Sequence, residues 1–122
     1  MKKCIYVVED NADIRDVIEY LLTEELYEVK AFSDTRHFWK EMSCARPDMI
    51  ILDIMLPDGN GIEVCNRLKH DSKTYHIPIM MMSANNHLNA VKSKCLAEDF
   101  INKPFDLNDF ADRVERYVLK TN

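Results

Sequence analysis

Residues 49–61, MIILDIMLPDGNG, decide the fold of this chain, because a short apolar run ends there in Asp53 and a turn-forming segment follows. The continuous apolar run at 49–52 is typical of a strand buried on both faces. Pro57, Gly59 and Gly61 predict a turn before the next helix. A buried strand leading through a turn into a helix indicates a parallel α/β architecture.

The same alternation extends outward in both directions. Short apolar runs predict five strands, at residues 4–8, 27–32, 49–52, 77–82 and 100–101. Segments of helical period follow them, at residues 14–22, from Ser33 to before Pro47, at 62–68, from about His87 to Leu96, and after Pro104. Asn11 or Asp10, Ser33 and Asp106 are the expected helix N-caps.

Five strands that alternate with five helices predict one α/β domain over residues 1–122. We expect a doubly wound, five-stranded parallel sheet of order 2-1-3-4-5, in a flavodoxin-like (βα)5 three-layer sandwich. In that order the first and third strands lie side by side at the topological switch point. Ligands of such sheets bind outside the carboxyl ends of the strands.

Composition excludes several classes of protein. The chain has 122 residues, a formal net charge of −5, 47% apolar residues and only two glycines. This balance is that of a globular domain, and its acidity argues against nucleic-acid or acidic-membrane binding. The apolar run at 4–8 is too short for a secretory signal and no run could span a bilayer. A cytoplasmic location is expected.

The cysteines and histidines do not form a ligand set. The four cysteines lie far apart without metal spacing, and we expect buried free thiols at Cys4, Cys44, Cys65 and Cys95. The four histidines fall in polar segments and are expected at the surface: His37, His70, His76 and His87.

Polar residues end four of the predicted strands. They are Glu9-Asp10, Asp53, Ser83-Ala84 and Lys103-Pro104. Three neighbouring carboxylates repel one another, and a hard divalent cation with oxygen ligands such as Mg²⁺ relieves this repulsion. Lys103 and Ser83 supply donors suited to phosphate oxygens, and Asp53 is a carboxylate able to attack phosphorus. The set predicts metal-assisted phosphoryl transfer.

These four motifs together resemble the receiver domain of two-component response regulators, over essentially the whole chain. The sequence of residues 53–57 and the presence of arginine at position 113 most resemble those of receivers from winged-helix transcription factors. The resemblance implies that Asp53 accepts phosphate from a sensor histidine kinase or a phosphotransfer protein. It also implies self-catalysed phosphorylation and slow autodephosphorylation rather than action on another substrate.

The resemblance also implies roles for the neighbouring residues. Glu9, Asp10, Asp53 and the backbone carbonyl of Met55 would hold Mg²⁺ or Mn²⁺. Ser83 and Lys103 would contact the phosphoryl oxygens, Phe100 would be the aromatic switch residue, and the Lys103–Pro104 bond would be cis. The face formed by the fourth helix, the fifth strand and the fifth helix would repack to control output. A phosphorylation-dependent homodimer is expected, with a solvated mixed-charge face as the alternative.

One departure from the family pattern stands at Leu96, where glycine is usual. Ordinary structural roles are the alternatives for the other residues: helix capping for Glu9, Asp10 and Ser83, and solvation for Lys103. Among functions, the main alternative is a pseudo-receiver that binds proteins without being phosphorylated. A phosphohydrolase would need a second acid where Met55 stands, and an FMN-binding loop would not carry the acidic residues 9–13.

Overall fold

Five parallel strands form the centre of the molecule. They are β1 (Cys4–Val8), β2 (Glu28–Phe32), β3 (Met49–Asp53), β6 (Ile79–Ala84) and β7 (Asp99–Lys103). The computed structural model describes residues 2–84 and 88–119 and places the strands in the order β2-β1-β3-β6-β7. Counted along the chain, this is the predicted order 2-1-3-4-5, so the expected flavodoxin-like fold is confirmed.

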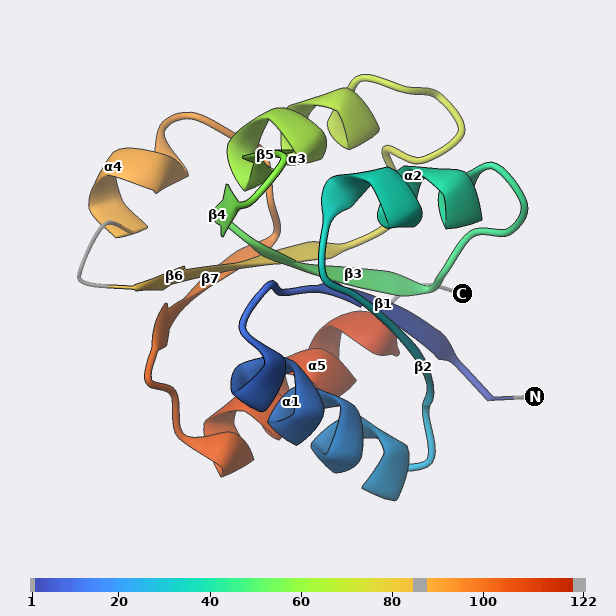
Figure 1. Ribbon diagram of the computed structural model, residues 1–122, viewed down its shortest axis with the longest axis vertical. Coiled ribbons are helices and arrows are strands. Elements are labelled where there is room, and N and C mark those ends of the chain that lie inside the picture. The colour runs from blue at the N-terminus through green and yellow to red at the C-terminus, as the bar shows by residue number, and fades with distance from the viewer. Residues whose placement is uncertain (1, 85–87, 120–122) are drawn as a thin grey trace.

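Helices cover both faces of the sheet (Figure 1). On one face lie α1 (Ala12–Glu24) and α5 (Leu107–Val118); on the other lie α2 (Thr35–Met42), α3 (Gly61–Lys69) and α4 (Leu88–Lys92). The chain therefore has the three layers of a doubly wound domain.

Alternate residues of each central strand enter two separate cores. In β1, Ile5 and Val7 pack toward α1 and α5, while Tyr6 and Val8 pack toward α2 and α3. Burial on both faces explains why these strands are continuously apolar. Each fully buried Ile or Val contributes roughly 1.5–3 kcal/mol relative to an exposed one, and these cores fix the strands whose ends form the site.

The helix caps agree with the sequence at two of three positions. Asn11 accepts from the Ile14 N–H at 3.0 Å, and Asp106 accepts from the Asp109 N–H at 3.0 Å. The prediction of Ser33 as a cap is wrong, because Asp34 accepts from the His37 N–H at 2.9 Å. A carboxylate at this position satisfies the free N–H and also interacts favourably with the helix dipole.

The boundaries of several elements differ from the predicted ones. β6 begins two residues later than expected, after Pro78, and β7 is longer than the predicted pair of residues. α4 ends at Lys92 instead of Leu96, and its expected start at His87 lies outside the described residues. A two-stranded hairpin, β4 (Met55–Leu56) with β5 (Gly59–Asn60), was not predicted.

The expectation of four buried thiols is wrong at Cys44. All four cysteines are free, and Cys65 and Cys95 are buried, but Cys4 is half-buried and Cys44 is exposed. Cys44 is exposed because α2 ends at Met42, which leaves Cys44 in the surface loop before β3. His37, His70 and His76 are exposed as expected.

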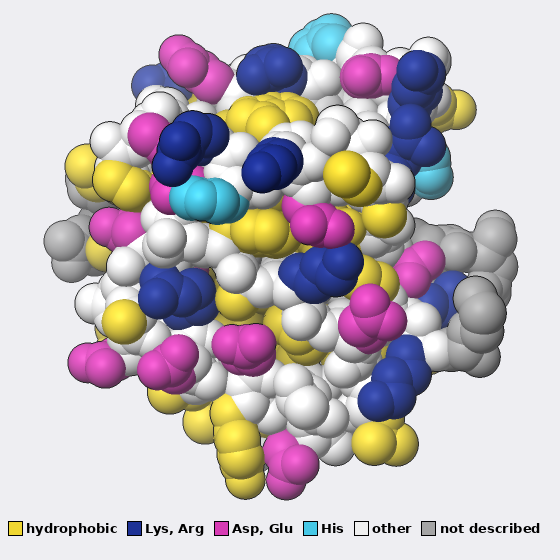
Figure 2. Space-filling view, turned by 45° about the vertical axis from the view of Figure 1, so that its right-hand side comes forward, with side chains coloured by type: hydrophobic (Ala, Val, Ile, Leu, Met, Phe, Trp, Pro, Cys, Tyr) yellow, Lys and Arg dark blue, Asp and Glu magenta, His cyan; other side chains and the backbone are white. Residues whose placement is uncertain are grey.

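Charges of both signs are interspersed on the surface. Figure 2 shows Lys and Arg side chains lying among Asp and Glu on one face, with small hydrophobic areas between them. Among the described helices, none is long and apolar enough to cross a membrane.

Candidate functional site

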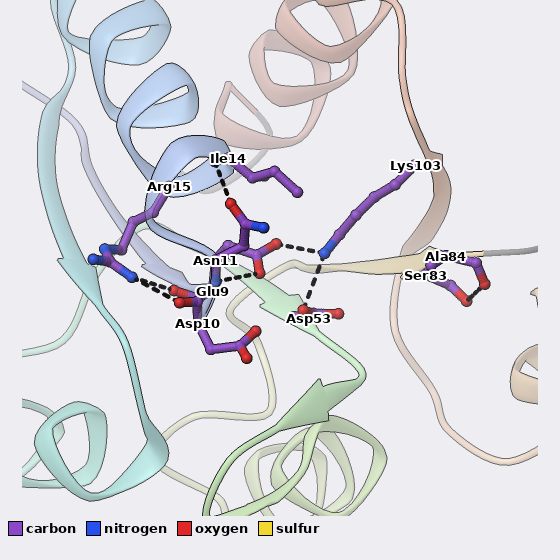
Figure 3. A network of polar contacts seen from close by, with 9 residues as sticks. All are labelled: Glu9, Asp10, Asn11, Ile14, Arg15, Asp53, Ser83, Ala84 and Lys103. Atoms are coloured by element: carbon purple, nitrogen blue, oxygen red, sulfur yellow. Dashed lines mark hydrogen bonds and ion pairs between the residues drawn. The ribbon is translucent and has the colours of Figure 1, made fainter.

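Two carboxylates and a lysine meet at the carboxyl ends of β1, β3 and β7. Glu9 directly follows β1, Asp53 ends β3, and Lys103 ends β7. β1 and β3 are adjacent, with Val8 paired to Leu52, so Glu9 and Asp53 leave neighbouring strands at the same edge. Figure 3 shows the Lys103 side chain reaching across from β7 to both carboxylates.

Glu9 is the most deeply buried group of the site, with no solvent exposure. Its Oε2 accepts from the Asn11 N–H at 3.1 Å. Its Oε1 lies 2.5 Å from Lys103 Nζ as an ion pair but has no hydrogen bond of acceptable geometry. Burial raises the pKa of Glu9 to about 7, against the opposing effect of Lys103.

Lys103 joins the two buried carboxylates. Its Nζ donates to Asp53 Oδ2 at 3.0 Å and pairs with Glu9. Burial alone would lower the pKa of Lys103, but its interactions with the Glu9 and Asp53 carboxylates outweigh that effect and raise it. Lys103 is therefore charged at neutral pH. The Lys103–Pro104 peptide bond is cis, as expected.

A third carboxylate, Asp10, completes an acidic cluster. One oxygen atom each of Glu9, Asp10 and Asp53 lies within 4.8 Å of the others, and Asp10 is exposed. Arg15 on α1 donates to the backbone oxygen of Glu9 at 2.8 Å and to that of Asp10 at 3.4 Å. Arg15 thus holds the segment from which both acids project; nothing in its sequence spacing indicates this role.

The residues of the cluster fit a hard divalent cation. They offer only oxygen ligands, and Glu9 Oε1 is a buried acceptor without a hydrogen bond. Mg²⁺ is commonly held by one or two carboxylates, with water and phosphate oxygens completing its shell. The three carboxylates carry more negative charge than the ammonium of Lys103 can balance. A cation bound here would compensate the remaining charge.

The loop after Asp53 forms a short hairpin that a backbone hydrogen bond closes. Met55 pairs with Asn60 in the β4–β5 hairpin, and the Gly61 N–H donates to the Ile54 carbonyl at 2.7 Å. Gly61 has no room for a side chain, since a Cβ there would lie 2.1 Å from the Asp53 carbonyl oxygen. Both glycines of the chain, Gly59 and Gly61, thus lie in the loop that follows Asp53, and the close approach at Gly61 requires a glycine.

Ser83 lines the same cleft as Asp53, whereas Phe100 lies three residues before Lys103 on β7 and does not line this cleft. Ser83 is buried, and its hydroxyl donates to the Ala84 carbonyl at 3.2 Å. Figure 3 shows Ser83 on β6, apart from the group formed by Glu9, Asp53 and Lys103. Phe100 is half-buried against the core under α3 and α4. The cleft over the site has a volume of about 1050 Å³ and extends from the acids to apolar residues of α1 and the β7–α5 loop.

The missing glycine before residue 97 does not lead to a strained backbone there. Among the described non-glycine residues only Leu26, in the α1–β2 turn, has a positive φ, of 70°. Leu96 is exposed and takes no left-handed conformation. The connection to β7 therefore forms without the turn that glycine would favour.

A doubly wound sheet whose carboxyl edge gathers three carboxylates and a lysine belongs to the class of open α/β domains that bind ligands at this edge. Within that class, the profile of the response regulator receiver domain matches residues 5–115. The chain belongs to this family, the receiver domains of two-component response regulators.

Two relatives of this chain are transcriptional regulatory proteins. The chain is 34% identical to the phosphate regulon transcriptional regulatory protein PhoB of Pseudomonas aeruginosa, over 98% of this chain and 53% of PhoB. It is 33% identical to the alkaline phosphatase synthesis transcriptional regulatory protein PhoP of Bacillus subtilis, over 99% of this chain and 50% of PhoP. The chain thus spans about half the length of these relatives.

Solved structures show the same fold. A response regulator from Chloroflexus aurantiacus superposes with a TM-score of 0.91 at 24% identity, over 98% of this chain and 99% of that one. The receiver domain of a Pseudomonas aeruginosa sensor histidine kinase, solved with a magnesium ion coordinated in the active-site cleft, has a TM-score of 0.85 at 25% identity, over 97% and 98%.

Proposed function

We propose that Asp53 is the phospho-acceptor of this receiver domain and takes a phosphoryl group from the phosphohistidine of a sensor histidine kinase or phosphotransfer protein. The observation that carries the proposal is the contact of Asp53 with Lys103 inside a cluster of three carboxylates. A carboxylate beside a fixed ammonium and a cation site is equipped to accept a phosphoryl group.

The transfer is a simple exchange of bonds at phosphorus. A carboxylate oxygen of Asp53 forms a bond to phosphorus while the bond from phosphorus to the histidine nitrogen breaks, and the imidazole leaves with that electron pair. Lys103 stays within reach of the new phosphoryl oxygens and balances their charge. Mg²⁺ or Mn²⁺, held by Glu9, Asp10, Asp53 and the Met55 carbonyl, would supply positive charge at the same oxygens.

We further propose that phosphorylation switches the face formed by α4, β7 and α5. The Ser83 hydroxyl would exchange its Ala84 partner for a phosphoryl oxygen, and Phe100 would turn into the space released. Ser83 lines the same cleft as Asp53, and its present acceptor is the carbonyl of the next residue. The switched face would carry the signal to the output, which PhoB and PhoP suggest is transcription.

The same face is the proposed site of a phosphorylation-dependent homodimer. Arg113 of α5 lies 3.2 Å from Asp99 and 3.1 Å from Asp109 of its own chain. Partly exposed pairs of this kind are weak, so their partners could be exchanged between two copies at low cost. The negative net charge of the chain fits a domain that acts on proteins in the cytoplasm rather than contacting nucleic acid itself.

The test is direct chemical phosphorylation. We expect a phosphoryl adduct in the intact mass after incubation with Mg²⁺ and a small acyl-phosphate donor. Asp53→Asn should form none, and Asp16→Asn, which alters an exposed aspartate of α1 outside the cluster, should still form it. Absence of an adduct on the wild-type chain at every Mg²⁺ concentration would support the pseudo-receiver alternative and overturn the proposal.

A further inference from the structure

Asp58 caps a helix that lies far from it in sequence. One carboxylate oxygen of Asp58 accepts from the Thr35 N–H at 2.9 Å, and the other accepts from the Arg36 N–H at 3.0 Å. Both amides belong to the first turn of α2, which has no intrahelical partner for them. Asp58 itself lies in the turn of the β4–β5 hairpin, which follows the acceptor Asp53.

Two aspartates therefore share the N-terminus of α2. Asp34 satisfies the His37 N–H from within the helix entry, whereas Asp58 satisfies the two preceding amides from the acceptor loop. The hydrogen bond from the Thr35 amide, followed by that from Arg36, lowers the pKa of Asp58, so its carboxylate stays charged at neutral pH. Charged acceptors make hydrogen bonds about twice as strong as neutral ones.

The hairpin is fixed to the molecule at three points. Leu56 is buried in the core under α2 and α3, the Gly61 N–H donates to the Ile54 carbonyl, and Asp58 holds the first turn of α2. Met55 stands between these points and pairs with Asn60 across the hairpin. Its side chain is 79% exposed, so no side-chain packing fixes the position of its backbone.

We propose that Asp58 is a positioning residue for the metal site: by holding the hairpin turn against α2 it sets where the Met55 carbonyl lies. The inference rests on the proposed function, which assigns that carbonyl to the cation. Asp58 touches neither the metal nor the phosphoryl group and acts only through the hairpin. Outer partners that orient metal ligands commonly change metal affinity by about 10–100-fold when removed.

The experiment measures Mg²⁺ binding itself, by titrating MgCl₂ into ¹⁵N-labelled protein and following the amides around Asp10 and Asp53. We expect Asp58→Ala to weaken Mg²⁺ binding about tenfold. Asp58→Asn keeps one of the two acceptor oxygens and should have an intermediate effect. The matched control is Asp34→Ala, which removes a cap of the same helix but leaves the hairpin attached, and should change Mg²⁺ affinity by less than about twofold.

Thermal melts of the same variants separate positioning from loss of stability. Both aspartate-to-alanine variants should lower Tm, but only Asp58→Ala should also weaken Mg²⁺ binding; if it does not fold, Asp58→Asn carries the comparison with Asp34→Asn. Equal Mg²⁺ affinity in the Asp58 variants and the wild type would overturn the inference alone. So would equal weakening by the Asp34 and Asp58 variants. Absence of saturable Mg²⁺ binding by the wild type would overturn the inference together with the metal assignment in the proposed function.

Discussion

At the scale of single residues, the free-energy cost of forming the site lies mainly in the burial of Glu9. This carboxylate is fully buried, and its cationic partner Lys103 is shared with Asp53. Burying an ionised carboxylate is expensive unless its charge is fully compensated. An ionised Glu9 therefore lowers the stability of the metal-free protein.

The stability of the metal-free chain should depend on pH through Glu9. The Glu9 pKa rises from about 4.5 in the unfolded chain to about 7 in the folded one. Between these values the folded state binds more protons, so the contribution of Glu9 to stability falls as the pH rises. In chelator, we expect Glu9→Gln to melt like the wild type at pH 5 and about 5 °C higher at pH 8.

Two comparisons complete this test. Glu63→Gln, which alters an exposed glutamate on α3, should show no such pH-dependent gain. At pH 8, Mg²⁺ should raise the Tm of the wild type more than that of Glu9→Gln, because binding to the folded state stabilises it. A Tm difference between Glu9→Gln and wild type that is the same at pH 5 and pH 8 would contradict the account.

Thiol chemistry provides a second test at this scale. Cys44 is exposed, whereas Cys65 is buried and burial raises its pKa to about 12. At pH 8 an aromatic disulfide reagent should react rapidly with Cys44, and with Cys65 and Cys95 only after denaturation. The rapid phase should vanish in Cys44→Ser; its persistence there would show that another thiol is accessible.

At the scale of elements, the tight closure of the loop after Asp53 depends on Gly61. A Cβ at Gly61 would clash with the Asp53 carbonyl at 2.1 Å, whereas one at Gly59 would meet Thr35 at an ordinary 3.6 Å. Overpacking against backbone typically costs about 1–3 kcal/mol. We expect Gly61→Ala to lower the free energy of unfolding by that amount in urea titrations, and Gly59→Ala to change it by less than about 0.5 kcal/mol. Equal stability of the two variants would contradict the observed geometry.

The elements also show what the sequence could predict. The strand ends at Glu9, Asp53 and Lys103 were placed correctly, because apolar runs mark buried strands and parallel strands end at a common edge. The cap of α2 by Asp58 could not be predicted, because the two are more than 20 residues apart and meet only through the fold. Ser33 and Asp34 are adjacent residues that can both cap a helix, and hydrophobic periodicity does not show which of them caps α2.

Other details of the site are set by tertiary packing and could not be predicted from the sequence pattern. The complete burial of Glu9 and the sharing of Lys103 between two acids depend on the side-chain directions at three strand ends. The position of Ser83 against Ala84 is likewise set by a local hydrogen bond. The roles assigned to Ser83, Phe100 and the Met55 carbonyl remain predictions.

At the scale of the whole molecule, the proposed homodimer can be tested by sedimentation. We expect the mass of the wild-type chain to rise with Mg²⁺ and beryllofluoride, an acyl-phosphate mimic, because the α4–β7–α5 face repacks and Arg113 exchanges its partners. Asp53→Asn should stay monomeric under the same conditions. An unchanged mass of the wild-type chain would argue for a solvated face instead.

Locating the transferred phosphoryl group in the chain tests whether Asp53 is the acceptor of a metal-dependent phosphoryl transfer. Borohydride reduces an aspartyl phosphate to homoserine, and peptide mass mapping then identifies the residue. After treatment with Mg²⁺ and an acyl-phosphate donor, the account predicts homoserine at position 53, and none when the metal is chelated. Homoserine at another aspartate, or at position 53 equally without metal, would contradict it.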